Sequence, residues 1–103
     1  MDSDKNENVK NREKVMIRAD KILDCSAHSI FTQACRQADH PDVQAIVVDL
    51  TATQGIRASG VGILLMLNDF GKKLSIPIRI ENCNPQIKTQ LASSRLLADL
   101  LVS

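Results

Sequence analysis

The stretch of sequence that decides the fold is residues 46–67, which read IVVDLTATQGIRASGVGILLML. It begins with a short β-branched run that is typical of a strand buried on both faces of a sheet. Residues 49–56 then supply threonine and glycine, which are typical of a turn. From Arg57 onward the spacing of the apolar residues changes and predicts a long apolar helix. We therefore expect a buried strand, a short loop and a helix in direct succession.

A serine stands near the start of this predicted helix, in the run Ala58-Ser59-Gly60. The first backbone N–H groups of a helix lack partners within the helix, and the helix dipole is positive there. A serine hydroxyl at that position can cap the helix, and a phosphate on the same hydroxyl would be stabilised by the same N–H groups. The residues alone leave both roles open for Ser59.

Upstream of this stretch, residues 15–19 predict a first strand, and residues 20–24 connect it to a helix. Either Asp24 or Ser26 can cap that helix. Pro41 ends it, because the residue before a proline is pushed out of helical geometry. One apolar face follows the helical spacing and consists of Ala27, Ile30, Phe31, Ala34, Cys35 and Ala38.

The second predicted helix, residues 58–74, holds more apolar residues than one buried face can hide. We assign Ile63, Leu64 and Leu67 to the core and expect part of the remainder to contact a partner. The helix also contains Gly60 and Gly62, each of which costs about 1 kcal/mol relative to alanine in a helix interior. Such a cost indicates close packing or the close approach of a partner; both glycines appear in this sequence as G-V-G.

The remaining elements flank this helix. Residues 45–50 predict a second strand, and residues 76–80 predict a third, which we place near an edge of the sheet because Pro77 cannot donate to a ladder. Asn84 followed by Pro85 is typical of the start of a helix. Ile87 and Leu91 form the buried side of that helix, and a last short apolar helix is predicted from Leu96, Leu97, Leu100 and Leu101.

The predicted order of elements is β-α-β-α-β-α-α. Alternating strands and helices imply an α/β fold, with a small mixed sheet, mainly parallel crossovers and helices packed against the sheet. The length of 103 residues suits a single domain with its own core. We expect that domain at residues 14–103, preceded by a mobile polar tail at residues 1–13, where Val9 supports at most a weak edge strand.

Composition excludes several classes of function. The net charge of +1 and the presence of two aromatic residues, both phenylalanine, argue against nucleic acid as a partner. No apolar run is long enough to insert into a membrane, and the polar start of the chain is not a secretory signal. Cys25, Cys35 and Cys83 form no C-x-x-C pair, which indicates free thiols in a reducing compartment. We expect a cytoplasmic protein that holds no metal ion.

The sequence offers little support for an enzyme. His28 and His40 have no obvious serine, cysteine or carboxylate partner by spacing, and the glycines match no phosphate-binding loop. Asp49 ends a buried strand, where a receiver domain keeps its phospho-accepting aspartate. Such a domain needs five β/α units and an acidic pair after its first strand, whereas three units fit here and Asp20 stands alone. We expect Asp49 to satisfy backbone donors in the turn.

The deciding stretch resembles the STAS domain, the fold of bacterial anti-sigma factor antagonists. In that family a strand that ends in Asp-Leu leads through a short loop to Asp-Ser-Ser-Gly and then to an apolar helix. The corresponding residues here are Asp49-Leu50, then Arg57-Ala58-Ser59-Gly60, then Val61-Gly62-Ile63-Leu64. The resemblance covers the chain from about residue 15 to its end and includes Ile22-Leu23-Asp24, which is similar to the family's Gly-Glu-Leu-Asp segment.

The resemblance implies a non-enzymatic protein-interaction switch without a cofactor. A protein of this kind binds an anti-sigma factor that is also a serine protein kinase, and phosphorylation of the second serine of the motif releases it. That serine corresponds to Ser59, and a phosphoserine phosphatase would reverse the modification. The implied partner-binding surface consists of Asp24, Arg57, Ala58, Ser59, Gly60, Val61 and Leu65.

Two departures from the family motif leave its chemistry open. The first serine of the motif is Ala58, and the family's aspartate is Arg57, which reverses a charge beside the phosphoacceptor. Arg57 can pair with a phosphate on Ser59, which an aspartate cannot do. Alternatively, the kinase that reads the aspartate is not the partner, and Ser59 only caps the helix. The second case favours another role, that of a STAS accessory subunit in a transport or signalling complex that does not cycle phosphate.

Overall fold

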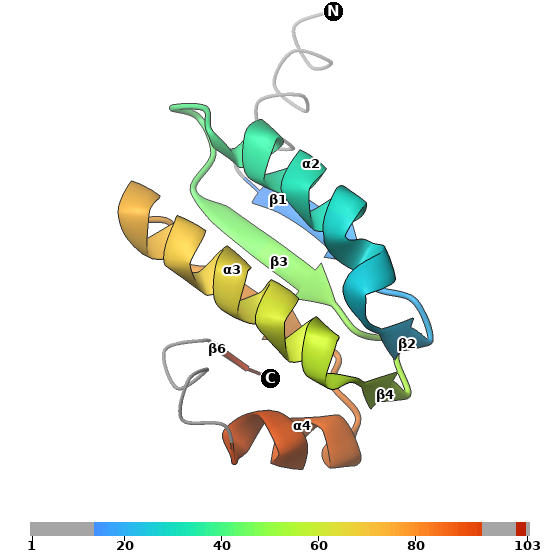
Figure 1. Cartoon of the computed structure of the whole chain (residues 1–103). Helices are drawn as coiled ribbons and strands as arrows, with labels where there is room; N and C mark the ends of the chain where they lie inside the picture. Colours follow the sequence, from blue (N-terminus) through green and yellow to red (C-terminus); the bar gives the residue numbers. More distant parts are fainter. Residues whose placement is uncertain (1–13, 94–100, 103) are drawn as a thin grey trace, which may run out of the picture.

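A four-stranded parallel sheet lies behind two helices in Figure 1. The computed structural model describes residues 14–93 and 101–102 of the chain. The strands are β1 (Lys14–Arg18), β3 (Ala45–Asp49), β5 (Ile78–Glu81) and β6 (Leu101–Val102), in the order β1-β3-β5-β6. All three pairings between them are parallel. The prediction of an α/β fold is confirmed.

Two rows of β-branched side chains run across the sheet and form the base of the core. One row joins Val15, Ile46 and Ile78, and the next joins Ile17, Val48 and Ile80. All six are buried. Such residues pack well on a pleated surface, which is why these short runs form strands.

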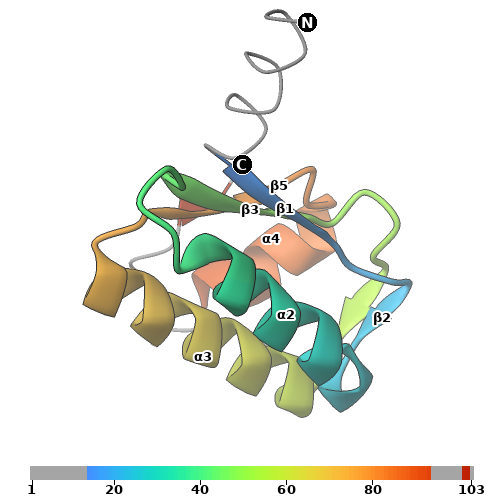
Figure 2. The ribbon, with the colours of Figure 1, turned by 90° about the horizontal axis from the view of Figure 1, so that it is seen from above.

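Two helices cover this face of the sheet. Figure 2, which shows the molecule from above, places α2 (His28–Ala38) and α3 (Ala58–Leu74) side by side on one side of the strands. They supply fully buried side chains, Phe31 from α2 and Leu64 and Leu67 from α3. Burial of a large apolar side chain contributes about 1.5–3 kcal/mol, so these contacts are a main source of stability. The predicted bounds of α3 are confirmed.

A second, two-stranded sheet joins the loops that precede α2 and α3. It consists of β2 (Ile22–Leu23) and β4 (Gly55–Ile56), paired in parallel with Leu23 beside Ile56. Figure 1 shows it at the end of the molecule where α3 begins. The sequence analysis expected only a connection and a turn here, because a strand of two residues has no measurable periodicity.

Three further expectations need correction. Strand β5 has β3 on one side and β6 on the other, so it is not an edge strand. Pro77 precedes β5 and therefore removes no donor from it, while its carbonyl accepts the Ile46 N–H at 3.1 Å. Ile30, predicted on the buried face of α2, is 48% exposed, because the buried stripe is narrower and consists of Phe31, Ala34 and Ala38.

The predictions for the two end regions of the chain have different outcomes. The predicted start of helix α4 (Pro85–Ala92) is confirmed, since the Asn84 side chain accepts the Ile87 N–H at 2.8 Å. Leu101, expected at the end of a last helix, lies in β6 and pairs with Arg79. The other leucines of that predicted helix and the predicted tail at residues 1–13 lie outside the described residues.

Candidate functional site

The two-stranded sheet brings two distant segments of the chain to one place. Beyond the pair Leu23 and Ile56, the ladder continues, because the Arg57 N–H donates to the Leu23 carbonyl at 2.9 Å. Asp24 follows β2 directly and Arg57 follows β4 directly. The two charged residues therefore lie next to each other, at the point where α3 begins.

Ser59 lies in the first turn of α3 and faces solvent. Its Oγ accepts the backbone N–H of Cys25 at 2.9 Å, a hydrogen bond between residues 34 positions apart. One hydroxyl oxygen has two lone pairs and one proton, so this bond leaves its proton free to be donated. The Ser59 hydroxyl is thus held in place by the neighbouring segment and remains accessible.

The hypothesis that Ser59 caps α3 is wrong for this structure. The N-cap of α3 is Arg57, whose backbone is extended, and its side chain makes no capping hydrogen bond. Ser59 lies two residues further on, inside the helix, and its oxygen is engaged with Cys25. A helix start without a side-chain cap leaves orphan N–H groups, which favour a negative charge nearby.

Gly60 fixes how closely α3 approaches the other segment. A Cβ at this position would lie 2.2 Å from the Leu23 carbonyl oxygen and 3.1 Å from a methyl carbon of Ile56. Only a residue without a side chain allows this contact, which explains one of the two glycines that the sequence analysis singled out. Since Gly60 is buried, it serves packing and does not present a surface to a partner.

The site carries charges of both signs, from Asp24 and Arg57. The pKa of Asp24 lies below its ordinary value. The main cause is two hydrogen bonds to its carboxylate, from the Ser26 hydroxyl and the Ser26 N–H, and the charge of Arg57 contributes less. The Ser26 N–H contact measures 3.0 Å and makes Asp24 the N-cap of the short 3-10 helix η1 (Cys25–Ala27). Asp24 therefore caps the short helix that leads into α2, whereas α2 itself begins after Ala27 without a side-chain cap, so the prediction that Asp24 or Ser26 caps α2 is wrong. The exposed guanidinium of Arg57 places a positive charge on the same surface.

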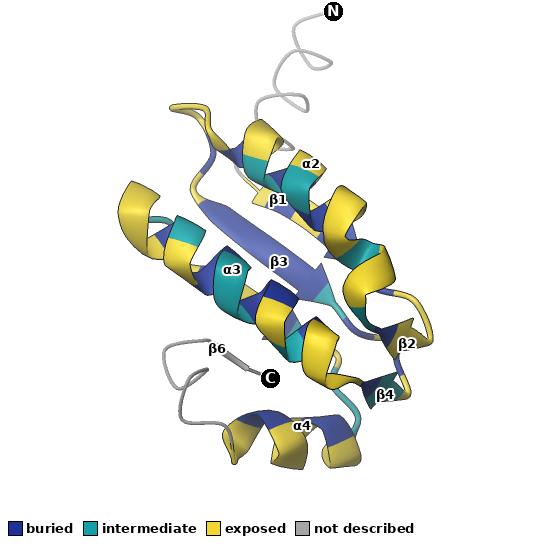
Figure 3. Ribbon diagram, in the orientation of Figure 1, coloured by how far each residue is buried: buried dark blue, intermediate teal, exposed yellow. Residues whose placement is uncertain are grey.

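The other predicted surface residues differ in exposure. Ala58 is exposed, whereas Val61 and Leu65 are half-buried and pack against the core. The three residues assigned to the core, Ile63, Leu64 and Leu67, are all buried. Figure 3 shows exposed and half-buried residues along the outer side of α3. Two of the half-buried residues close to Ser59 in the sequence, Val61 and Leu65, are apolar.

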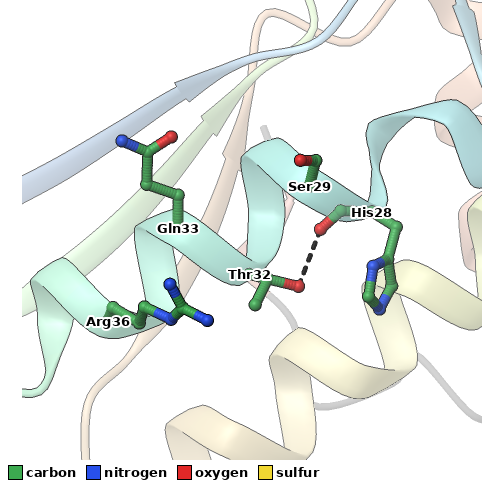
Figure 4. Close-up of a pocket in the computed structure, with 5 residues that line it drawn as sticks. All are labelled: His28, Ser29, Thr32, Gln33 and Arg36. Atoms are coloured by element: carbon green, nitrogen blue, oxygen red, sulfur yellow. Dashed lines mark hydrogen bonds between the residues drawn. The ribbon is translucent and has the colours of Figure 1, made fainter.

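A shallow hollow on the outer side of α2 shows no catalytic arrangement. It has a volume of about 340 Å³ and is lined by His28, Ser29, Thr32, Gln33 and Arg36, all from one helix. The Thr32 hydroxyl donates to the His28 carbonyl at 2.8 Å, a local helix contact. Figure 4 shows the His28 ring and the Ser29 hydroxyl pointing away from each other, which does not suit a base and its nucleophile.

Asp49 and His40 both make local contacts in turns. The Asp49 carboxylate accepts the Thr51 N–H at 3.0 Å and the Asn82 amide at 3.1 Å, so the expected role in the turn is confirmed. His40, expected to have no carboxylate partner, lies 3.7 Å from Asp42 through its Nδ1. The same nitrogen accepts the Asp42 N–H at 3.2 Å, which makes this a local turn contact.

Ligands for a metal ion are not gathered in the part of the chain that the structure describes. No three His, Cys, Asp or Glu side chains there form a group that could hold one. The three cysteines are free, as expected, and burial raises the pKa of the Cys35 and Cys83 thiols. Among the described helices, none is long and apolar enough to cross a membrane.

The arrangement of strand, loop, serine and helix can be compared with known proteins. A family model for the STAS domain matches residues 3–102. The chain belongs to the STAS domain family. Among solved structures, this STAS domain is similar to the anti-sigma factor antagonist SpoIIAA in its unphosphorylated form, with a TM-score of 0.67 and 19% sequence identity, over 89% of this chain and 80% of that one. No curated protein matches its sequence.

The structure also shows site atoms that sequence reasoning missed. The Cys25 N–H and the Leu23 carbonyl hold Ser59 and α3 in place, and both belong to the backbone. Backbone groups are the same in every residue, so no residue type in the sequence marks them. The spacing of Ser59 after the strand was the available signal in the sequence, and it placed Ser59 in the first turn of α3, where the structure has it.

Proposed function

We propose that this STAS domain is a non-enzymatic antagonist of an anti-sigma factor, working in the cytoplasm. It binds an anti-sigma factor that is also a serine kinase, and phosphorylation of Ser59 releases it. The observation that carries the proposal is the exposed Ser59 hydroxyl, held at the start of α3 by the N–H of Cys25, the residue after Asp24. The family membership and the shared fold with SpoIIAA support it.

Phosphorylation would change the charge at the centre of this surface. A phosphoserine carries about −1.5 to −2 charges at neutral pH and three strong acceptor oxygens. On Ser59, the phosphate would be repelled by the Asp24 carboxylate. It would be attracted by the N–H groups at the start of α3 and by Arg57. The modified domain would therefore remain folded while its docking surface becomes strongly negative. A phosphoserine phosphatase would return it to the binding form.

Three substitutions test the switch. Ser59→Glu should abolish binding to the anti-sigma factor, whereas Ser59→Ala should bind and resist inactivation by kinase and ATP. Arg57→Asp should change the thermal stability of the unmodified protein little but lower that of the phosphorylated form through like-charge repulsion. Partner affinity by calorimetry and phosphate incorporation by intact mass, with and without ATP, check these outcomes. Equal affinities of Ser59→Glu and the unmodified wild type would refute the switch.

A second candidate function follows from the departures in the motif. Arg57 and Ala58 stand where the family has aspartate and serine, which favours an accessory subunit that binds its complex without cycling phosphate. In that case the protein recovered from its source cell carries no phosphate and co-purifies with a transport or signalling complex. The proposed partners in either case are proteins, not nucleic acid or the membrane itself.

A further inference from the structure

Gly62 is a glycine that the fold of this domain does not require. It lies in the second turn of α3 and is exposed, and a Cβ built on it would meet nothing within 4 Å. Its backbone does not adopt a positive φ, so any L-residue fits its conformation. Glycine in a helix interior nonetheless costs about 1 kcal/mol relative to alanine. Within the described part of the domain, nothing offsets that cost.

The other glycines of α3 show what a structural reason looks like. At Gly60 an added Cβ would lie 2.2 Å from the Leu23 carbonyl oxygen, and at Gly71 it would lie 2.7 Å from the Ile76 carbonyl oxygen. Both glycines allow another segment of the chain to touch the helix backbone. Gly62 has the same type of opening, but it faces outward. If a close approach to the backbone explains Gly62 as it explains Gly60 and Gly71, the approaching group belongs to another molecule.

The position of Gly62 connects it to the Ser59 surface. Residues three and four apart lie on the same face of a helix, so Gly62 lies between Ser59 on one side and Leu65 and Met66 on the other. Leu65 and Met66 are half-buried, as is the adjacent Val61, and all three pack at the border of the core. The surface is thus a gap over the helix backbone with partly exposed apolar side chains beside it.

We propose that Gly62 is the point at which the protein partner packs directly against the backbone of α3, and that it determines which partner is accepted. The inference rests on the proposed function, because it takes the occupant to be the anti-sigma factor that reads Ser59, one helical turn away. The partner element that fits is apolar at its centre, to contact Val61, Leu65 and Met66. A carboxylate at its end would face the exposed Arg57.

A methyl group added at position 62 should affect the stability of the domain and its affinity for the partner in opposite directions. Gly62→Ala should raise the melting temperature of the isolated domain by about 3–6 °C, because it removes the cost of a helical glycine. The same methyl group would hold the partner away from the backbone and weaken its affinity by about tenfold or more. Gly62→Leu should weaken binding further while the domain still folds. The exposed Lys73→Ala, in the last turn of the same helix, is the control and should leave affinity unchanged.

The experiment measures the affinity of these variants for each purified anti-sigma factor kinase of the source organism, together with their melting temperatures and self-association. A more stable Gly62→Ala variant that binds more weakly supports the inference. Equal binding of wild type and Gly62→Ala overturns it and leaves the proposed function intact. If the wild type binds none of these kinases, the proposed function fails and the partner assignment fails with it. If Gly62→Ala instead abolishes self-association, the occupant is a second copy, which also overturns the assignment.

Discussion

The Asp49 carboxylate shows how one side chain holds a turn at the carboxyl end of the sheet. It accepts hydrogen bonds from the Thr51 hydroxyl, the Asn82 amide and the Thr51 N–H, and these bonds lower its pKa below the ordinary value of 3.8. A carboxylate whose pKa is lowered by folding stabilises the folded state while it is ionised. Through Asn82, the Asp49 carboxylate thus connects the turn after β3 to the residues after β5.

The lowered pKa of Asp49 predicts a pH dependence of stability. The contribution is fully present above the ordinary pKa of 3.8 and is lost as the pH falls through the lower pKa of the folded state. The difference in unfolding free energy between wild type and Asp49→Asn should therefore be constant at neutral pH and shrink below about pH 4. Urea titrations between neutral and acidic pH measure it. A difference that does not change with pH would show that the charge of Asp49 has no role.

At the scale of an element, the end of α3 depends on the backbone conformation of one residue. The C-cap residue Ser75 adopts a left-handed conformation, with φ 56° and ψ 40°, and its N–H donates to Gly71 and Lys72 carbonyls. This conformation is the usual one after a helix, where glycine is preferred because it has no Cβ to clash with the backbone. An L-residue there costs about 1–2 kcal/mol. Helix α3 thus ends in a strained residue.

Relief of this strain should stabilise the domain. Ser75→Gly should raise the free energy of unfolding by about 0.5–1 kcal/mol, the net of the removed strain and the greater freedom of glycine in the unfolded chain. Ser75→Ala retains the strain and serves as the matched control, with stability equal to or below that of wild type. Chemical denaturation of the three proteins compares them. A destabilised Ser75→Gly variant would show that the serine makes a compensating contact.

At the scale of the whole molecule, the sheet is completed by residues from the end of the chain. Strand β6 pairs with β5 through Arg79 to Leu101 and Ile80 to Val102. Without it, β5 would become an edge with unpaired backbone groups beside the fully buried Ile80. Leu101 and Val102 are therefore part of the fold.

Removal of residues 101–103 tests this contribution. The deletion should lower the melting temperature by several degrees, at about 4–8 °C for each kcal/mol lost in a domain of this size. The double substitution Leu101→Thr and Val102→Thr keeps the backbone pairing and should have a smaller effect. An unchanged melting temperature in the truncated protein would show that β6 adds no stability.

The sequence predicted the longer helices and strands of this fold better than the contacts between segments far apart in the chain. Helix α3 and the start of α4 were predicted from apolar spacing and from the Asn-Pro pair, because these signals are local. The pairing of β2 with β4 was missed, since a ladder of two residues depends on segments 33 positions apart. Ser59 was located by its spacing, but its contact with Cys25 depends on that missed ladder.

The parallel pairing has a consequence for how the domain comes into being. Partners in the β1–β3 ladder, such as Lys14 and Ala45, are 31 positions apart (45 minus 14), and the described sheet has no hairpin that could form early. Loop closure must precede each of these contacts, which slows folding. During synthesis, the hydrogen bond between Cys25 and Ser59 cannot form until Ser59 has left the ribosome. The surface around Ser59 therefore forms only after these two distant segments of the chain have joined.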